Sequence, residues 1–248
     1  MINYSIYIVL WALLGSAFHQ VQDDDRLIVS YYRSSATGSL PDTIDRGIGI
    51  LTFKEDPGHH FEGRWDTISA YATPSAGNSP SALLIYEEKG GGWKYGVGSN
   101  DTLQPNIIEF DYERCGFPFD SVTSDSWARV VLGFNTGRSP QFAWVKLDTS
   151  LVQFEVWSSL IPKHRLFFQG TPLFYHEPEG TTVEWSVTRR DYIMHPIRTQ
   201  GQWMYVRVAR PSDMCVDPEI VKSDTLITWI KYLDDKGRPL VWYYSRGC

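Results

Sequence analysis

From Arg26 onward, the chain is patterned in short runs of apolar, β-branched and aromatic residues separated by Gly, Pro, Asn and Asp. Such side chains suit the half-buried surface of a sheet, and Gly and Pro mark turns. No long segment keeps a helical period, and the best helix candidate is the short run at 152–160, VQFEVWSSL. The pattern therefore predicts an all-β protein. Strands are expected at 27–32, 48–53, 82–86, 128–132, 142–147, 182–187, 204–208, 226–233 and 240–244.

Two halves of the chain carry the same series of aromatic motifs in the same order. An aromatic-then-proline turn comes first, then a W-x-x-V segment, then a segment with Trp and Lys two residues apart. The segments are 71–74 (YATP), 127–130 (WARV) and 142–146 (FAWVK), and then 175–178 (YHEP), 203–206 (WMYV) and 228–231 (TWIK). Because the order is shared while the loop lengths differ, the sequence predicts a duplicated domain rather than a solenoid.

This series of motifs resembles the bacterial SH3-like domains, small barrels that are common in exported proteins. In that family, W-x-x-V lies on one strand and a Gly-Trp-Val or similar segment on the next. Here Ala143 and Thr228 stand in place of that glycine. The resemblance covers residues 65–147 and 168–244. It implies two small SH3-like barrels in tandem, the first with an N-terminal extension.

A small barrel needs large side chains to fill its core, and Trp buries more area than any other residue. We therefore expect the repeated tryptophans to be structural. They are Trp127, Trp144, Trp203 and Trp229.

Residues 1–17 have the layout of a secretory signal peptide, with an apolar run at 6–14 followed by Gly15-Ser16-Ala17. Cleavage is expected after Ala17, although no Lys or Arg precedes the run. The alternative, an uncleaved membrane anchor, needs about 20 apolar residues, and this run is shorter. The sequence thus predicts a secreted or periplasmic protein that has no membrane span after cleavage.

The remaining chain divides into a first SH3-like domain with its N-terminal extension at 18–150 and a second domain at 165–248. The boundary is expected within 148–165, where Ile161-Pro162 interrupts the strand pattern. Residues 18–64 precede the first motif. They either add strands to the first domain or form a separate extension, and the sequence leaves both open.

Composition narrows the range of functions. The chain has 248 residues, a net charge of -6 and 15% aromatic residues, with 10 Trp. An acidic balance argues against a nucleic-acid binder that relies on phosphate contacts, because such proteins are basic. The abundance of aromatic residues argues against intrinsic disorder.

Residues that could carry chemistry are few. Export would permit a disulfide, and Cys215 with Cys248 is the preferred pair, which leaves Cys115 as a small buried residue; the other pairings stay open. No cysteine has the helix and histidine context of a nucleophile, and no G-x-S-x-G motif occurs. His59 and His60 are adjacent, so on a strand they would point to opposite faces. We expect no catalytic residue, metal site or cofactor. Asn100 begins a glycosylation sequon.

Five aromatic residues outside the repeated motifs are the candidate binding residues. Trp93 follows three glycines and is expected at a hairpin tip, where an exposed ring could stack on a sugar or grip a peptide. The alternative is that these rings fill space between the domains. The five are Trp93, Tyr95, Tyr192, Trp242 and Tyr243.

The resemblance implies an exported, non-enzymatic binding module for a cell-envelope glycan or peptide, or for another exported protein. This inference rests on the fold resemblance alone. A cell-envelope hydrolase with a site between the domains is the first alternative, and a structural or interaction subunit is the second. Converging polar groups in a cleft would favour the hydrolase, and a broad apolar patch would favour the subunit.

Overall fold

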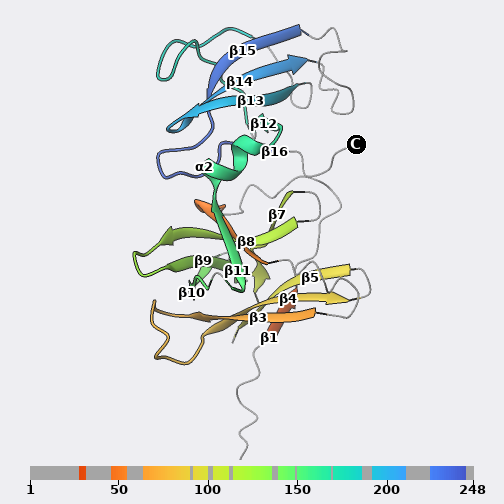
Figure 1. The fold of residues 1–248 in the computed structure, drawn as a ribbon, viewed down its shortest axis with the longest axis vertical. Helices are drawn as coiled ribbons and strands as arrows, with labels where there is room; N and C mark the ends of the chain where they lie inside the picture. The colour runs from red at the N-terminus through yellow and green to blue at the C-terminus, as the bar shows by residue number, and fades with distance from the viewer. Residues whose placement is uncertain are drawn as a thin grey trace, which may run out of the picture.

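The structure is a computed structural model that consists of two antiparallel sheets and one short helix in its described part (Figure 1). The all-β expectation is confirmed. The residues described are 28–31, 46–54, 64–89, 92–99, 103–111, 114–135, 139–148, 150–168, 170–185, 192–210 and 224–243.

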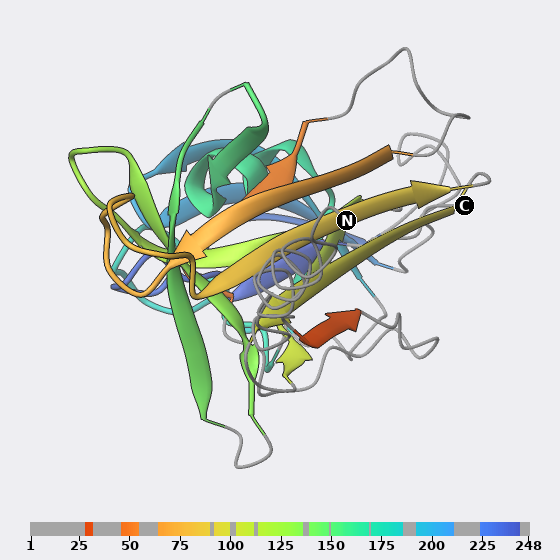
Figure 2. The ribbon, with the colours of Figure 1, turned by 90° about the horizontal axis from the view of Figure 1, so that it is seen from below.

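The N-terminal sheet is 11-stranded and follows the path β1-β5-β4-β3-β10-β9-β8-β2-β11, with β6 beside β9 and β7 beside β8. Figure 2 views it from below, where β3, β4 and β5 run side by side. Its strands are β1 (Ile28–Tyr31), β2 (Gly49–Phe53), β3 (Arg64–Tyr71), β4 (Ala82–Lys89), β5 (Gly92–Ser99), β6 (Gln104–Pro105), β7 (Ile108–Asp111), β8 (Arg114–Val122), β9 (Trp127–Phe134), β10 (Pro140–Lys146) and β11 (Val152–Val156).

The C-terminal sheet is 5-stranded, in the order β15-β14-β13-β12-β16. A helix, α2 (Trp157–Leu160), and a 3-10 turn, η1 (Ile161–Lys163), connect the two sheets. The strands are β12 (Leu166–Phe168), β13 (Ile193–Gln200), β14 (Trp203–Arg210), β15 (Asp224–Lys231) and β16 (Val241–Tyr243).

Two groups of buried residues hold the fold together. One lies within the N-terminal sheet, where inward residues of β8, β9 and β10 pack against β2 to β5. The other lies under the C-terminal sheet and includes Trp157 and Leu160 of α2. This second group also takes in Ile50, Ile108 and Phe110 of the N-terminal sheet, so apolar packing is continuous from one sheet to the other.

The expected closed barrels are not confirmed, because neither sheet closes on itself within the described strands. The path of the N-terminal sheet ends at β1 and β11, and that of the C-terminal sheet ends at β15 and β16. In the C-terminal sheet, Tyr175 forms an isolated antiparallel bridge with Trp229 of β15.

Two other expectations can be compared with the fold. Residues 28–31 and 49–53, from the segment whose role was open, both form strands of the N-terminal sheet. The helix candidate at 152–160 is half wrong: Val152–Val156 is a strand that pairs with β2, and the helix covers only Trp157–Leu160. Among the described residues, no helix is long and apolar enough to cross a membrane.

Candidate functional site

Three of the five candidate binding residues lie in the cores. Tyr95 packs among Phe53, Tyr86 and Phe117 in the N-terminal sheet. A ring that is buried to this extent has little surface to offer a ligand.

The other two buried candidates belong to the core below the C-terminal sheet. Tyr192 accepts a hydrogen bond from the backbone N–H of Phe168 at 2.9 Å through its hydroxyl group. Trp242 packs edge-to-face on Trp157 at 5.2 Å, and the Arg46 guanidinium lies 4.6 Å from its ring centre. Both rings therefore lie in the core below the C-terminal sheet.

Trp93 and Tyr243 are described by their backbones only. Trp93 is the second residue of β5, directly after Gly92, and stands opposite Glu88. Tyr243 ends β16 opposite Leu166.

Groups that could carry chemistry are sparse in the described part of the chain. Cys115 is a buried free cysteine, and burial, together with the charge of Glu109, raises the pKa of its thiol far above the ordinary value. Such a thiol stays protonated and is a poor nucleophile. No cluster of three His, Cys, Asp or Glu suited to a metal occurs among the described residues.

Several expectations fall on residues outside the described ranges. They are the signal peptide at 1–17, the pair Cys215 and Cys248, the pair His59 and His60, and Asn100.

The most distinctive surface is the outer face of the C-terminal sheet, which we call the C-terminal aromatic face. A row of side chains crosses the strands there: Tyr175 pairs with Trp229, Trp229 with Tyr205, and Tyr205 with Arg198. In the next row, Trp203 packs edge-to-face on Tyr175, with ring centres 5.0 Å apart and planes at 87°. Tyr175, Trp203 and Tyr205 are partly exposed, and Arg198 is exposed.

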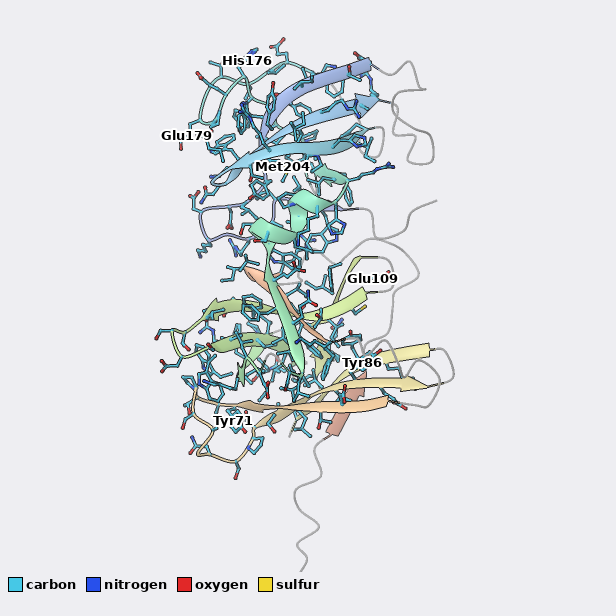
Figure 3. All side chains as sticks on the ribbon, viewed as in Figure 1. Tyr71, Tyr86, Glu109, His176, Glu179 and Met204 are labelled. Carbon is cyan, nitrogen blue, oxygen red and sulfur yellow. The ribbon has the colours of Figure 1, made fainter. Side chains whose placement is uncertain are left out.

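Strand alternation explains why these rings lie outside. Successive side chains of a strand point to opposite faces. On β14, Met204, Val206 and Val208 are buried in the core, so the residues between them must face outward. Figure 3 shows Met204 on this strand and, at the outer end of the molecule, the turn that carries His176 and Glu179. Trp203, which was expected in a barrel core, therefore lies on the outer face, and the alternation along β14 was the signal that could have placed it. Trp229 is buried, at 7% exposure, beside Tyr205 and Arg198.

Arg198 lies over two rings of this face. Its guanidinium is 5.2 Å from the centre of Tyr205 and 5.2 Å from that of Trp229, whose rings are themselves 5.0 Å apart. A guanidinium over aromatic faces is stabilised by their quadrupoles. In the described part of the chain, no carboxylate forms an ion pair with Arg198.

Tyr175 is held in the face by its backbone. Its N–H donates to the Trp229 carbonyl at 2.9 Å, and its own carbonyl accepts from the Trp229 N–H at 3.0 Å. The same carbonyl accepts from the buried hydroxyl of Thr228 at 2.7 Å. These bonds occupy the edge of β15 at this point, so a peptide cannot add there as a further strand.

Charge varies along the face. Lys231, opposite Trp203, pairs with Asp235 at 2.7 Å, and this hydrogen bond raises its pKa. Farther along, Arg207 stands opposite His195. Burial lowers the pKa of His195, and the positive charges of Arg207 and Arg165 lower it further, so the imidazole is neutral at neutral pH.

Comparison with protein family models, curated proteins and solved structures found no match to this chain.

Proposed function

We propose that the protein is a non-enzymatic binding module that recognises an extended cell-envelope glycan on the C-terminal aromatic face. One observation carries the proposal. The row of Tyr175, Trp229 and Tyr205 ends in a guanidinium that stacks on two rings and has no carboxylate partner among the described residues. Tyr175 and Tyr205 of this row and Trp203 beside it are partly exposed, and such rings offer large rigid contact areas at low entropic cost.

The shape of the face favours a sugar chain over a peptide. The C–H faces of pyranose rings pack against aromatic rings, while their hydroxyl and carboxylate groups accept hydrogen bonds from a guanidinium. The row runs across the strands, as suits a ligand lying over the sheet. A peptide that adds as a strand would need the part of the β15 edge that Tyr175 already holds.

The SH3-like relationship and export belong to this proposal. The shared motif order supports the first, and the apolar run at 6–14 supports the second. The hydrolase alternative finds no converging His, Cys or carboxylate groups in the described residues that would favour it.

The test is isothermal titration of the full chain with a neutral N-acetylglucosamine tetrasaccharide and with an acidic tetrasaccharide of alternating amino sugar and uronic acid. We expect binding, with the acidic sugar preferred. Trp203→Ala should weaken it by about 10-fold or more, because stacking on one ring contributes about 1–3 kcal/mol in nucleic-acid complexes of comparable geometry. Trp203→Phe should restore most of the loss.

The matched control is Phe154→Ala. Phe154 is 40% exposed, but it lies on β11 in the other sheet, so its loss should leave affinity unchanged. Failure of both sugars to bind the wild-type chain would overturn the proposal, and binding of a proline-rich peptide on Trp203 instead would replace the glycan with a peptide ligand.

A further inference from the structure

Three strands of the N-terminal sheet repeat the arrangement of the C-terminal aromatic face, pair by pair. In β9 and β10, Lys146 stands opposite Trp127, and Trp144 opposite Arg129. In β14 and β15, Lys231 stands opposite Trp203, and Trp229 opposite Tyr205. The motifs that are shared in the sequence therefore occupy the same register positions in the two sheets.

The correspondence extends to both flanks. On one side, Tyr71 of β3 pairs with Trp144 as Tyr175 pairs with Trp229. Tyr71 packs edge-to-face on Trp127 at 5.6 Å and 85°, and Tyr175 on Trp203 at 5.0 Å and 87°.

On the other flank, the register shifts at equivalent places. In β8 the shift falls between Phe119 and Ser121, just before the residue that pairs with Arg129. In β13 it falls between Pro196 and Arg198, just before the residue that pairs with Tyr205. A bulge redirects the side chains of its strand, so sharing it gives the two faces the same local shape.

The N-terminal face also offers apolar surface to solvent. Phe142 is 38% exposed, and the guanidinium of Arg129 lies 5.0 Å from its ring centre. Trp144 is partly exposed beside it, and Lys146 lies 5.4 Å from the ring centre of Trp127. Two differences separate this face from the C-terminal aromatic face: Arg129 stands at the position of Tyr205, and Ser121 at that of Arg198.

We propose that this N-terminal face, made of Tyr71, Trp127, Arg129, Phe142, Trp144 and Lys146, is a second site for the same glycan, so that one chain holds two segments of one polymer. This inference rests on the proposed function. The occupant follows from the four equivalent positions that carry the same residue type, because matching rings and a matching lysine suit the same repeating chemistry. These positions are Tyr71 and Tyr175, Trp127 and Trp203, Trp144 and Trp229, and Lys146 and Lys231. Figure 3 shows Tyr71 of the N-terminal face and, toward the other end of the long axis, Glu179 of the turn that follows Tyr175.

The two faces differ in one electrostatic respect. Arg129 is held by both carboxylate oxygens of Asp120, at 2.8 and 2.6 Å, so its charge is neutralised. Arg198 has no such partner among the described residues. Binding to the C-terminal aromatic face should therefore weaken with salt, and binding to the N-terminal face should depend less on salt.

The experiment measures stoichiometry and avidity with the full chain. The acidic tetrasaccharide is titrated first, and a long polymer of the same sugars second. We expect two tetrasaccharides per wild-type chain, and one for Phe142→Ala and for Trp203→Ala. On the long polymer, each single variant should bind about 100-fold more weakly than wild type, because linking two sites raises avidity by about 10²–10⁴.

Phe142 is exposed, so its substitution is not expected to disturb folding, and near-ultraviolet circular dichroism checks this. Trp144→Ser is a second variant of the same face. Phe154→Ala, another exposed Phe of the same sheet, is the matched control and should retain both sites. One tetrasaccharide per wild-type chain, lost in Trp203→Ala, would overturn the second site and leave the proposed function standing. Two sites that both survive Phe142→Ala and Trp144→Ser would also overturn it. Absence of binding to either sugar would overturn both proposals.

Discussion

Replacement of Thr228 by Val tests how the C-terminal aromatic face is held together. Thr228 is buried, and its hydroxyl donates to the Tyr175 carbonyl at 2.7 Å. Val has nearly the same shape but cannot donate, so the substitution removes the bond with little change in packing. Tyr175 should then be fixed less firmly against Trp203.

The expected loss of stability depends on the hydrogen bond that the Tyr175 carbonyl retains in Thr228→Val. Its second bond, from the Trp229 N–H at 3.0 Å, remains after the substitution. The carbonyl is therefore only partly unsatisfied, and we expect the free energy of unfolding to fall by about 1 kcal/mol, within the usual net value of about 0.5–1.5 kcal/mol for one hydrogen bond. Glycan affinity should fall several-fold, because Tyr175 is a part of the face.

Urea unfolding gives the free energy, and amide hydrogen exchange at Trp229 reports the local loosening. Thr228→Ser keeps the hydroxyl and should retain the exchange protection. Thr225→Val, at an exposed position of the same strand, should leave stability within about 0.5 kcal/mol of wild type. If Thr228→Val matched wild type in both stability and Trp229 protection, the argued role of this hydrogen bond would be refuted.

Three further outcomes are expected. Trp157→Ala should lower the free energy of unfolding, measured in urea, by about 3–5 kcal/mol. The reason is that this fully buried indole belongs to the core that joins the sheets and donates to the Arg46 carbonyl at 2.8 Å. A loss below about 1 kcal/mol would contradict this. Because the pKa of His195 is lowered in the folded protein, the unfolded chain binds the proton more readily, and stability should fall as pH drops below the ordinary pKa of 6.5. His195→Gln should make the free energy of unfolding depend less steeply on pH in this range. An equal dependence on pH in both proteins would show that other groups are responsible. Cys115 should react with a thiol reagent only after unfolding, because its thiol is buried and protonated. Mass spectrometry measures the labelling. Rapid labelling of Cys115 in the native chain would be inconsistent with its burial.

The all-β class could be predicted from the sequence because β-branched runs and turn residues alternate along the whole patterned part of the chain. Trp127 and Trp203, which the motif alignment equates, each stand opposite a lysine of the neighbouring strand. What local pattern could not supply was the pairing of distant segments. Val152–Val156 became a strand because β2, about a hundred residues earlier, offers it an edge. The bridge between Tyr175 and Trp229 of β15 is a second pairing of distant segments of this kind.

The binding residues were harder to choose, because an aromatic ring looks the same in sequence whether it faces the core or solvent. Tyr192 and Trp242 were selected for lying outside the repeated motifs, yet they are in the core. Trp203 was assigned to the core, yet alternation with buried Met204 and Val206 turns it outward. Applying the period of two to β14 alone would have separated the two faces.

The most direct test of the C-terminal aromatic face is nuclear magnetic resonance of the chain labelled with nitrogen-15 at its Trp indoles, titrated with the acidic tetrasaccharide. If the C-terminal aromatic face is the binding surface, the Nε1–H resonance of partly exposed Trp203 should shift on binding, while those of buried Trp157 and Trp242 should stay in place. Shifts confined to Trp157 and Trp242, or no shift at any indole at saturating sugar, would contradict the assignment of this face as the binding surface.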